Sequence, residues 1–332
     1  MQRLLFILAL GWSTLTSAQI LPNFGGQRAG LSTLSFLKNE MNPESLGMSG
    51  AGVALKGNVF SSATNPAGLT ALDDFSFGLS HMTIGAGIQQ SLISSQFKLK
   101  NTSTIGFQIN SLNSGQMEVR TEFQPNGTGN YFSVSQSAIT GNYAMKMTEM
   151  FSLGIGLKMI YENMAGYSNM TAGLDLGFLY ETDFRNLRFA VVVQNFGGSS
   201  SINGSDVMVG YNRNGNVELA RYTIPTTFRM GFSIDAYQKD KHLVIGAMEL
   251  NNPNDNSENI RFGFEYQYAE LLSVQTGYKI SVKGHGYPTL GMAYKTRIGA
   301  HPMFIQYAMN PTNYMGTQHL IGLRFTRNKM ER

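Results

Sequence analysis

The chain has 332 residues, of which only 14% are charged and 11% are aromatic, and its formal net charge is +4. Soluble proteins carry about 25% charged residues, so this composition indicates little aqueous surface. The small positive excess is spread along the chain, which excludes the basic face of a nucleic-acid-binding protein, and the absence of cysteine excludes disulfide and thiolate chemistry.

Residues 1–18 have the features of a secretory signal peptide. Arg3 precedes the apolar run 4–12, and the small residues Thr16 and Ala18 fit a cleavage site. The run is shorter than the roughly 20 residues that a helix needs to span a bilayer. We therefore predict export with cleavage after Ala18. No later stretch is apolar for long enough to form such a helix, so any membrane contact must come from strands.

Residues 19–72 lack the alternation of strands. Leu31 to Lys38 could form a short helical turn, and the small-residue run 46–53 leads toward an Asn-Pro-Ala-Gly box. Small residues let one backbone pack closely on another, so we predict an N-terminal plug at 19–72. The glycine-rich run is not a phosphate loop, because it lacks the Gly-Lys-Ser/Thr ending. The residues of interest are Gly47, Gly50, Gly52, Asn65, Pro66, Ala67 and Gly68.

Residues 73–326 repeat one pattern, in which eight to twelve residues of alternating character precede a short polar turn. In 259–268, for example, aromatic and aliphatic residues alternate with charged and small ones, which predicts strands with two different environments. Candidate strands lie near 74–82, 87–98, 103–112, 115–122, 134–147, 151–163, 170–182, 186–195, 225–237, 242–250, 259–268, 271–283, 289–298, 301–308 and 317–326.

A soluble sandwich and a membrane barrel share this periodicity, so other features must separate them. Many strands reach the nine to eleven residues that cross a bilayer at a tilt, tyrosines and phenylalanines lie near strand ends, and charges are few. We therefore predict an all-β fold, a transmembrane antiparallel barrel whose apolar faces meet lipid. Single-chain bacterial barrels use even strand numbers, so one candidate must be a neighbour's extension or a loop hairpin, leaving about fourteen strands. Residues 327–332 form a charged C-terminal tail.

The turns alternate in length along the chain. Short links at 148–149, 183–186, 269–270 and 299–300 are expected on the periplasmic side, and the longer segments 123–133, 196–224 and 251–258 on the outside. Charged residues on the inward faces could select solutes, but ion pairing across a filled barrel is the favoured interpretation, because buried charges need partners. These residues are Lys158, Asp175, Glu181, Arg188, Arg229, Asp235, Arg261, Glu265, Lys279, Lys295 and Arg324.

No motif indicates an enzyme, a cofactor or a metal site. The five histidines, His81, His242, His285, His301 and His319, lack metal-ligand spacing. Ser49 lacks the Gly-x-Ser-x-Gly setting of a hydrolase nucleophile.

Four motifs in order give the chain a resemblance to a known family. These are Leu46 to Ala54, Asn65 to Leu69, Thr121 to Gly129 with Pro125, Gly127 and Gly129, and Gln194 to Gly197 with Asn195 and Gly197. They resemble the PorV/PorQ family of outer-membrane barrels, similar in fold to the FadL fatty-acid transporters. The chain is shorter than a typical PorV-like member, so the paralogue stays open. It ends in a charged tail and not at the terminal aromatic common in outer-membrane barrels, which leaves Phe325 as the expected last aromatic of the final strand.

The resemblance implies a non-enzymatic component of type IX protein secretion in the outer membrane. Its partners would be membrane lipid, secreted cargo bearing a C-terminal signal domain, and other secretion components, with no nucleic acid and no metal. A FadL-like channel for hydrophobic small molecules is the alternative, favoured by the Asn-Pro-Ala-Gly box and the aromatic content. A soluble exported β-sandwich adhesin is a third possibility.

Overall fold

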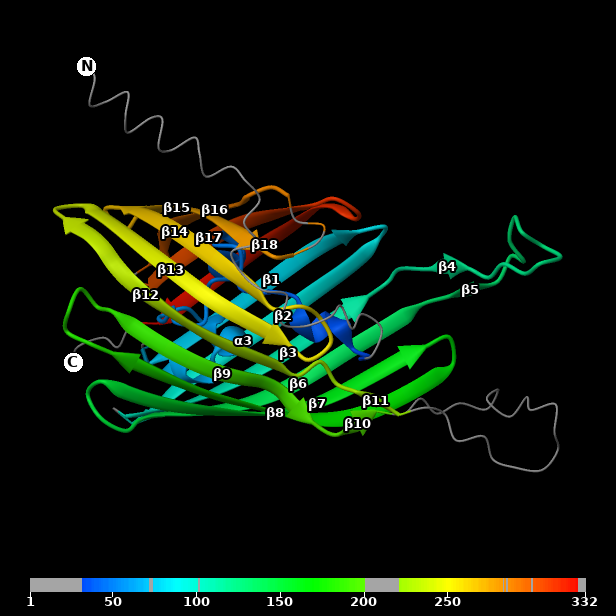
Figure 1. The fold of residues 1–332 in the computed structure, drawn as a ribbon, viewed down its shortest axis with the longest axis horizontal. Helices are drawn as coiled ribbons and strands as arrows, with labels where there is room; N and C mark the ends of the chain where they lie inside the picture. Colours follow the sequence, from blue (N-terminus) through cyan, green and yellow to red (C-terminus); the bar gives the residue numbers. More distant parts are fainter. Residues whose placement is uncertain are drawn as a thin grey trace, which may run out of the picture.

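Fourteen antiparallel strands form a closed barrel around a short N-terminal segment (Figure 1). The computed structural model describes residues 32–71, 74–100, 102–200, 221–282, 284, 286–299 and 301–327, so the predicted signal peptide lies outside the described residues. The first strand pairs with the last and closes the sheet: Leu79 faces Leu323 on one side and Ile93 on the other. Closure leaves the barrel no free edge.

The barrel strands are long. They are β1 (Phe75–Gly85), β2 (Ile88–Lys100), β3 (Ser103–Asn113), β6 (Val134–Lys146), β7 (Phe151–Met164), β8 (Tyr167–Glu181), β9 (Arg188–Gly197), β12 (Thr227–Lys239), β13 (His242–Pro253), β14 (Asn259–Tyr268), β15 (Leu272–Ile280), β16 (Thr289–Ile298), β17 (His301–Thr312) and β18 (Gly316–Arg327). Two small hairpins lie outside it, β4 (Met117–Glu118) with β5 (Tyr131–Phe132), and β10 (Ser199–Ser200) with β11 (Tyr222–Thr223).

The helical elements are short and precede the barrel in sequence. They are η1 (Ser35–Lys38), α2 (Pro43–Gly47), α3 (Ser61–Thr64) and η2 (Pro66–Ala71). Within the described residues no helix is sufficiently long and apolar to cross a membrane.

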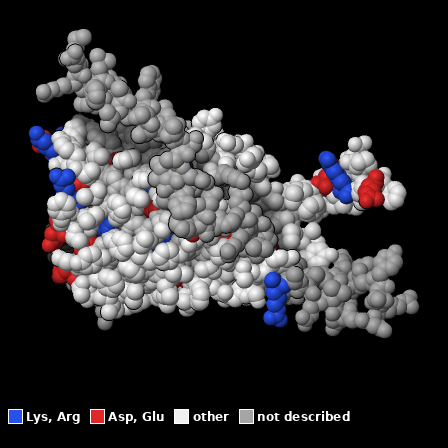
Figure 2. Space-filling model, viewed as in Figure 1, with Lys and Arg blue, Asp and Glu red and all other residues white. Residues whose placement is uncertain are grey.

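Burial is reversed relative to a soluble sheet protein. Outward side chains such as Leu157, with 67% of its surface exposed, and Phe264, with 56%, are apolar. Inward side chains such as Ser80, Gln90 and Glu265 are buried. The part of the barrel side that is visible in Figure 2 is mostly uncharged, and most of the charges lie at one end of the barrel and on a projecting hairpin. Because monomeric soluble proteins rarely expose such a continuous apolar surface, this is the pattern of a barrel whose outside faces lipid.

The predicted fold class and strand number are confirmed, with local corrections. Candidate 115–122 is not a barrel strand; it lies in the β4–β5 hairpin, where only Met117 and Glu118 pair. Residues 251–253, predicted as loop, extend β13, because Asn251 pairs with Arg229 and with Asn259. β15 ends at Ile280, earlier than predicted. Arg327, assigned to the tail, is the last residue of β18, and residues 328–332 lie outside the described part.

The predicted alternation in the length of the connections is only partly seen, because the turns at 86–87 and 165–166 are short although they lie at the end with the long loops. Short turns such as 240–241 and 269–271 lie at one end, on the left of Figure 1. The longer connections 114–133 and 198–226 leave the other end, where the β4–β5 hairpin projects well beyond the barrel. A segment with its ends fixed on a rigid barrel is where recognition is expected.

Candidate functional site

Residues 32–71, called here the luminal segment, lie inside the barrel. Its helix α2 contacts β15, β16, β17 and β18, while η2 contacts β3, β6, β7 and β8 on the opposite wall. The Ser80 hydroxyl donates to the Met41 carbonyl at 2.9 Å, and the Ser94 hydroxyl donates to the Val59 carbonyl at 2.9 Å. The segment therefore crosses the lumen and is fixed to strands on both sides. Its predicted role as a plug remains a prediction, and residues 19–31 and 72 lie outside the described part.

The Asn-Pro-Ala-Gly box anchors the segment to the β7–β8 wall. The Asn65 amide donates to the Val53 carbonyl at 3.0 Å, and its side-chain oxygen accepts the backbone N–H of Ala67 at 2.9 Å. A side chain at Gly154 would lie 2.3 Å from the Ala67 nitrogen, and one at Gly177 would lie 2.3 Å from the Asn65 oxygen. The absence of side chains at Gly154 and Gly177 therefore lets the Asn-Pro-Ala-Gly box pack directly against β7 and β8.

Replacing Gly154 with valine is expected to displace the box. The new side chain would collide with backbone, which cannot rotate away, and overpacking of this kind costs about 1–3 kcal/mol. The protection of amides 65–71 from hydrogen exchange should fall. Gly141→Val on the neighbouring strand is the control, because nothing lies within 4 Å of a side chain added there. Equal protection in the two variants would contradict the assignment.

The small-residue run 46–53 packs against the opposite wall. A side chain at Gly47 would lie 3.0 Å from the Gly291 Cα, and one at Gly52 would collide with Ser45. Gly50 has a positive φ of 80°, and a side chain there would meet the Arg261 guanidinium. The predicted residues of the two plug motifs are therefore brought together in the lumen, in packing roles.

Two arginines fix the turn at Gly50. Arg229 donates to the Gly50 carbonyl at 2.9 Å and Arg261 at 3.3 Å. Glu249 accepts from Arg229 at 2.7 Å and lies 3.5 Å from Arg261, and its other oxygen accepts the Val53 N–H at 3.0 Å. Arg229 also pairs with Glu40 of the luminal segment at 3.2 Å. Glu40 and Glu249 were not among the predicted residues.

Other predicted inward charges also pair. Lys158 lies 3.0 Å from Asp175, Arg188 lies 2.8 Å from Asp235, and Lys56 of the luminal segment pairs with Glu181. Three residues differ from the prediction. Lys295 pairs with Glu270, a turn residue whose side chain is 83% exposed. Glu265 and Lys279 form no ion pair among the described residues.

The remaining predicted motifs lie elsewhere. Asn195 has a positive φ of 54° at a register shift between β8 and β9, and its backbone N–H donates to Asp175 at 2.7 Å. Gly197 packs against the Ala172 carbonyl beside it. These two residues therefore shape a bulge in the wall. Pro125, Gly127 and Gly129 belong to the projecting hairpin, remote from the luminal box, where both glycines have positive φ.

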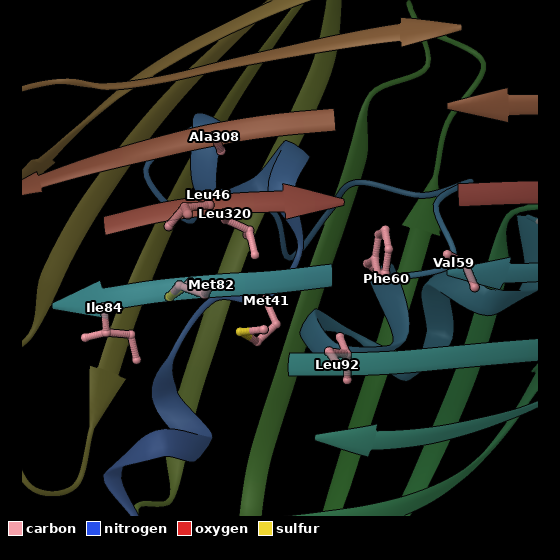
Figure 3. Packing of buried hydrophobic residues seen from close by; sticks show 9 residues of the cluster. All are labelled: Met41, Leu46, Val59, Phe60, Met82, Ile84, Leu92, Ala308 and Leu320. Atoms are coloured by element: carbon pink, nitrogen blue, oxygen red, sulfur yellow. The ribbon is translucent and has the colours of Figure 1, made fainter. Parts of the chain in front are cut away.

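The lumen is lined by apolar clusters as well as by ion pairs. Met82, Leu92 and Leu320, from β1, β2 and β18, point inward against Met41, Leu46 and Phe60 of the luminal segment (Figure 3). A second cluster continues this surface toward the long loops, and both contact Leu112. The second cluster comprises Leu34, Phe36, Ala138, Ile160 and Ile224. Most of the ion pairs described above lie on β7–β9 and β12–β14. Smaller apolar clusters lie on the same strands, with Leu179 and Val192 against Val53 and with Ile245 against Met48.

Two polar cavities lie against α2. One of about 170 Å³ is bordered by Lys38, Glu40, Arg261 and Lys279, and another of about 260 Å³ by Glu44, Glu265 and Gln306 with their neighbours. Neither is an apolar pocket. Within the described residues, no group of three or more acidic or histidine side chains is placed to hold a metal ion.

The luminal segment is also tied to the β13–β14 loop. Lys38 donates to Asp255 at 2.6 Å, and Ser32 donates to the same carboxylate. Burial alone would raise the pKa of Asp255, but the hydrogen bonds from Lys38 and Ser32 outweigh it and hold the pKa below its ordinary value.

The tie should therefore weaken in acid. A carboxylate with a depressed folded-state pKa stabilises the fold fully above its unfolded pKa of about 3.9, and this contribution is lost as the pH falls through the folded value. Hydrogen exchange of amides 33–39 should accelerate across that range. Asp255→Asn should show the fast exchange at every pH, and an unchanged profile in the variant would contradict the tie.

The fold is that of the FadL-like outer-membrane β-barrels. A channel for monoaromatic hydrocarbons, CymD, superposes with a TM-score of 0.58 at 13% identity, covering 88% of this chain and 98% of that one. A FadL homologue of Pseudomonas aeruginosa gives 0.56 at 10% identity, covering 90% and 100%. The toluene transporter TodX of Pseudomonas putida gives 0.53 at 12%, covering 86% and 96%. No protein-family model and no curated protein matches the sequence.

Proposed function

We propose that the chain is an outer-membrane channel for small hydrophobic molecules, closed in the described state by the luminal segment. The observation that carries this proposal is the apolar inner wall. In a lumen that held only water and ion pairs, inward apolar side chains such as Met82, Leu92 and Ile160 would have no function. Here these side chains are covered by Leu34, Phe36 and Met41 of the luminal segment. When the segment moves, the wall becomes an apolar surface along the lumen.

The likeness to structures described as hydrocarbon and toluene channels supports the same proposal at the level of fold. The lipid-facing outer surface supports placement in the outer membrane, and the signal peptide predicted at residues 1–18 would deliver the chain there. The chemistry required is passage, with no bond made or broken, so the protein needs no catalytic group.

Uptake of radiolabelled toluene by intact bacteria tests the proposal. The host should lack its own channels of this type, and its lipopolysaccharide layer slows apolar molecules. Expression of the chain should raise the initial uptake rate several-fold above that of cells expressing an unrelated outer-membrane barrel. An unchanged rate, with the chain folded in the membrane, would contradict a channel function.

A second candidate is the type IX secretion role implied by the sequence motifs. The β4–β5 hairpin favours it, because the hairpin projects far beyond the barrel (Figure 1). It also carries Phe123, which is 94% exposed. A rigid, filled barrel would then serve as a support for cargo or for other secretion components. Co-purification from a strain that secretes such cargo tests this. Loss of the cargo when 117–132 is replaced by a short turn would support the role, and purification without any cargo would count against it.

A further inference from the structure

The cavity on the short-turn side of α2 has an unusual set of polar groups. It measures about 260 Å³ and lies between the luminal segment and the inner faces of β13 to β18. The charged side chains that border it are Glu44, Lys56, Glu265, Glu270, Lys295 and Arg324.

The basic side chains of this cavity are directed to other partners. Lys56 pairs with Glu181, and Lys295 pairs with Glu270 at 3.1 Å. Arg324 donates to the Gly57 carbonyl at 2.9 Å, and its guanidinium lies 3.7 Å from the centre of the Phe304 ring.

Three acidic or amide side chains at the cavity carry oxygen atoms that lack a basic partner. One oxygen of Glu265 accepts from Gln275 at 3.0 Å and from Gln267 at 3.1 Å, but the other has no hydrogen-bond partner. The Gln306 side-chain oxygen also has none, and both residues are only 3% exposed. Glu44 borders the same cavity, with a single hydrogen bond from Asn58 at 2.8 Å and no ion pair among the described residues.

We propose that this cavity binds a monovalent cation, with Glu265, Gln306 and Glu44 as its oxygen ligands. A buried carboxylate oxygen and a buried amide oxygen without donors are costly, and a cation satisfies both. The charges also fit, because the cavity and its ion pairs contain four carboxylates, Glu44, Glu181, Glu265 and Glu270, against three cations, Lys56, Lys295 and Arg324. One positive charge balances the set. The site is independent of what the barrel transports.

Anomalous diffraction from crystals grown in thallium(I), a substitute for potassium, tests the proposal. A peak is expected in contact with Glu265 and Gln306, and it should disappear in Glu265→Gln. Glu162→Gln is the matched control, because Glu162 is a buried inward carboxylate that accepts from Gln136 elsewhere in the lumen. The thallium peak beside Glu265 should remain in this variant. Absence of the peak from the native protein, with ordered water in its place, would overturn the proposal, and so would a peak that persists in Glu265→Gln.

Thermal unfolding gives a second readout that needs no crystals. A cation that binds only the folded state stabilises it in proportion to the logarithm of its concentration. The native Tm should rise when potassium chloride replaces N-methylglucamine chloride at constant ionic strength, and the Glu44→Gln and Glu265→Gln proteins should lose that rise. Equal Tm values of the native protein in the two salts would contradict the site, whether or not the variants fold.

Discussion

Oxidising the double variant Ser49→Cys/Thr289→Cys is expected to abolish toluene uptake, and reduction is expected to restore it. The two hydroxyl oxygens lie 2.9 Å apart, one in the luminal segment and one at the start of β16. Cysteines at these positions are close enough for a disulfide, and the native chain has no cysteine to interfere. The bond would fix the luminal segment to the wall, so the covered apolar surface could not open.

The control is a second disulfide that does not involve the luminal segment. Ser76 and Thr326 are inward-facing neighbours on β1 and β18, with their hydroxyl oxygens 3.3 Å apart. Oxidised Ser76→Cys/Thr326→Cys should transport as the native protein does, because it joins two strands that already pair. Full transport by the oxidised Ser49/Thr289 pair would show that the segment need not move.

Glu249→Gln should give the largest loss of stability of any single substitution considered. Glu249 is 1% exposed and is shared by Arg229 and Arg261, so a neutral side chain leaves one buried and one half-buried guanidinium group with only Glu40 as a counter-charge. Breaking a buried pair in this way costs about 3–5 kcal/mol. The free energy of unfolding from lipid vesicles, measured in urea, is the readout.

Removing one of the arginines should recover part of that loss. In Glu249→Gln/Arg261→Met a single buried guanidinium remains, and Glu40 lies 3.2 Å from it. Glu270→Gln is the control, since its pair with Lys295 is exposed and should be worth about 0–1 kcal/mol. If Glu249→Gln cost no more than Glu270→Gln, the buried network would have no role in holding the luminal segment.

The barrel was predictable from the sequence because one chemical pattern recurs in every strand. In 259–268 the aromatic face and the face that carries Glu265 can both be recognised in the sequence. The length of the strands then favoured a membrane barrel over a soluble sandwich. The inward positions of Lys158 and Asp175 followed from the same alternation, although the structure was needed to show that the two residues pair with each other.

The centre of the candidate site was not predictable in this way. Glu249 follows three apolar residues on the inward face of β13, Leu243, Ile245 and Ala247, so the alternation did not indicate a charged inward position there. Glu40 meets Arg229 across 189 positions of sequence, and no local pattern reports such a contact. In the sequence, a glycine such as Gly154 cannot be told from any other strand glycine. Its role becomes clear only from its contact with the Asn-Pro-Ala-Gly box in the structure.

Quenching of a single tryptophan by brominated lipid tests most directly whether the apolar outer face meets hydrocarbon. Trp12 is the only tryptophan and lies in the predicted signal peptide, so Trp12→Phe provides a silent background. Leu157→Trp places the probe on an outward position that is 67% exposed, and Met82→Trp places it on an inward position that is 1% exposed. In vesicles of lipid brominated near the bilayer centre, the probe at 157 should be strongly quenched and the probe at 82 should not. Equal quenching of the two, or none at 157, would contradict a barrel whose outer face lies in the membrane.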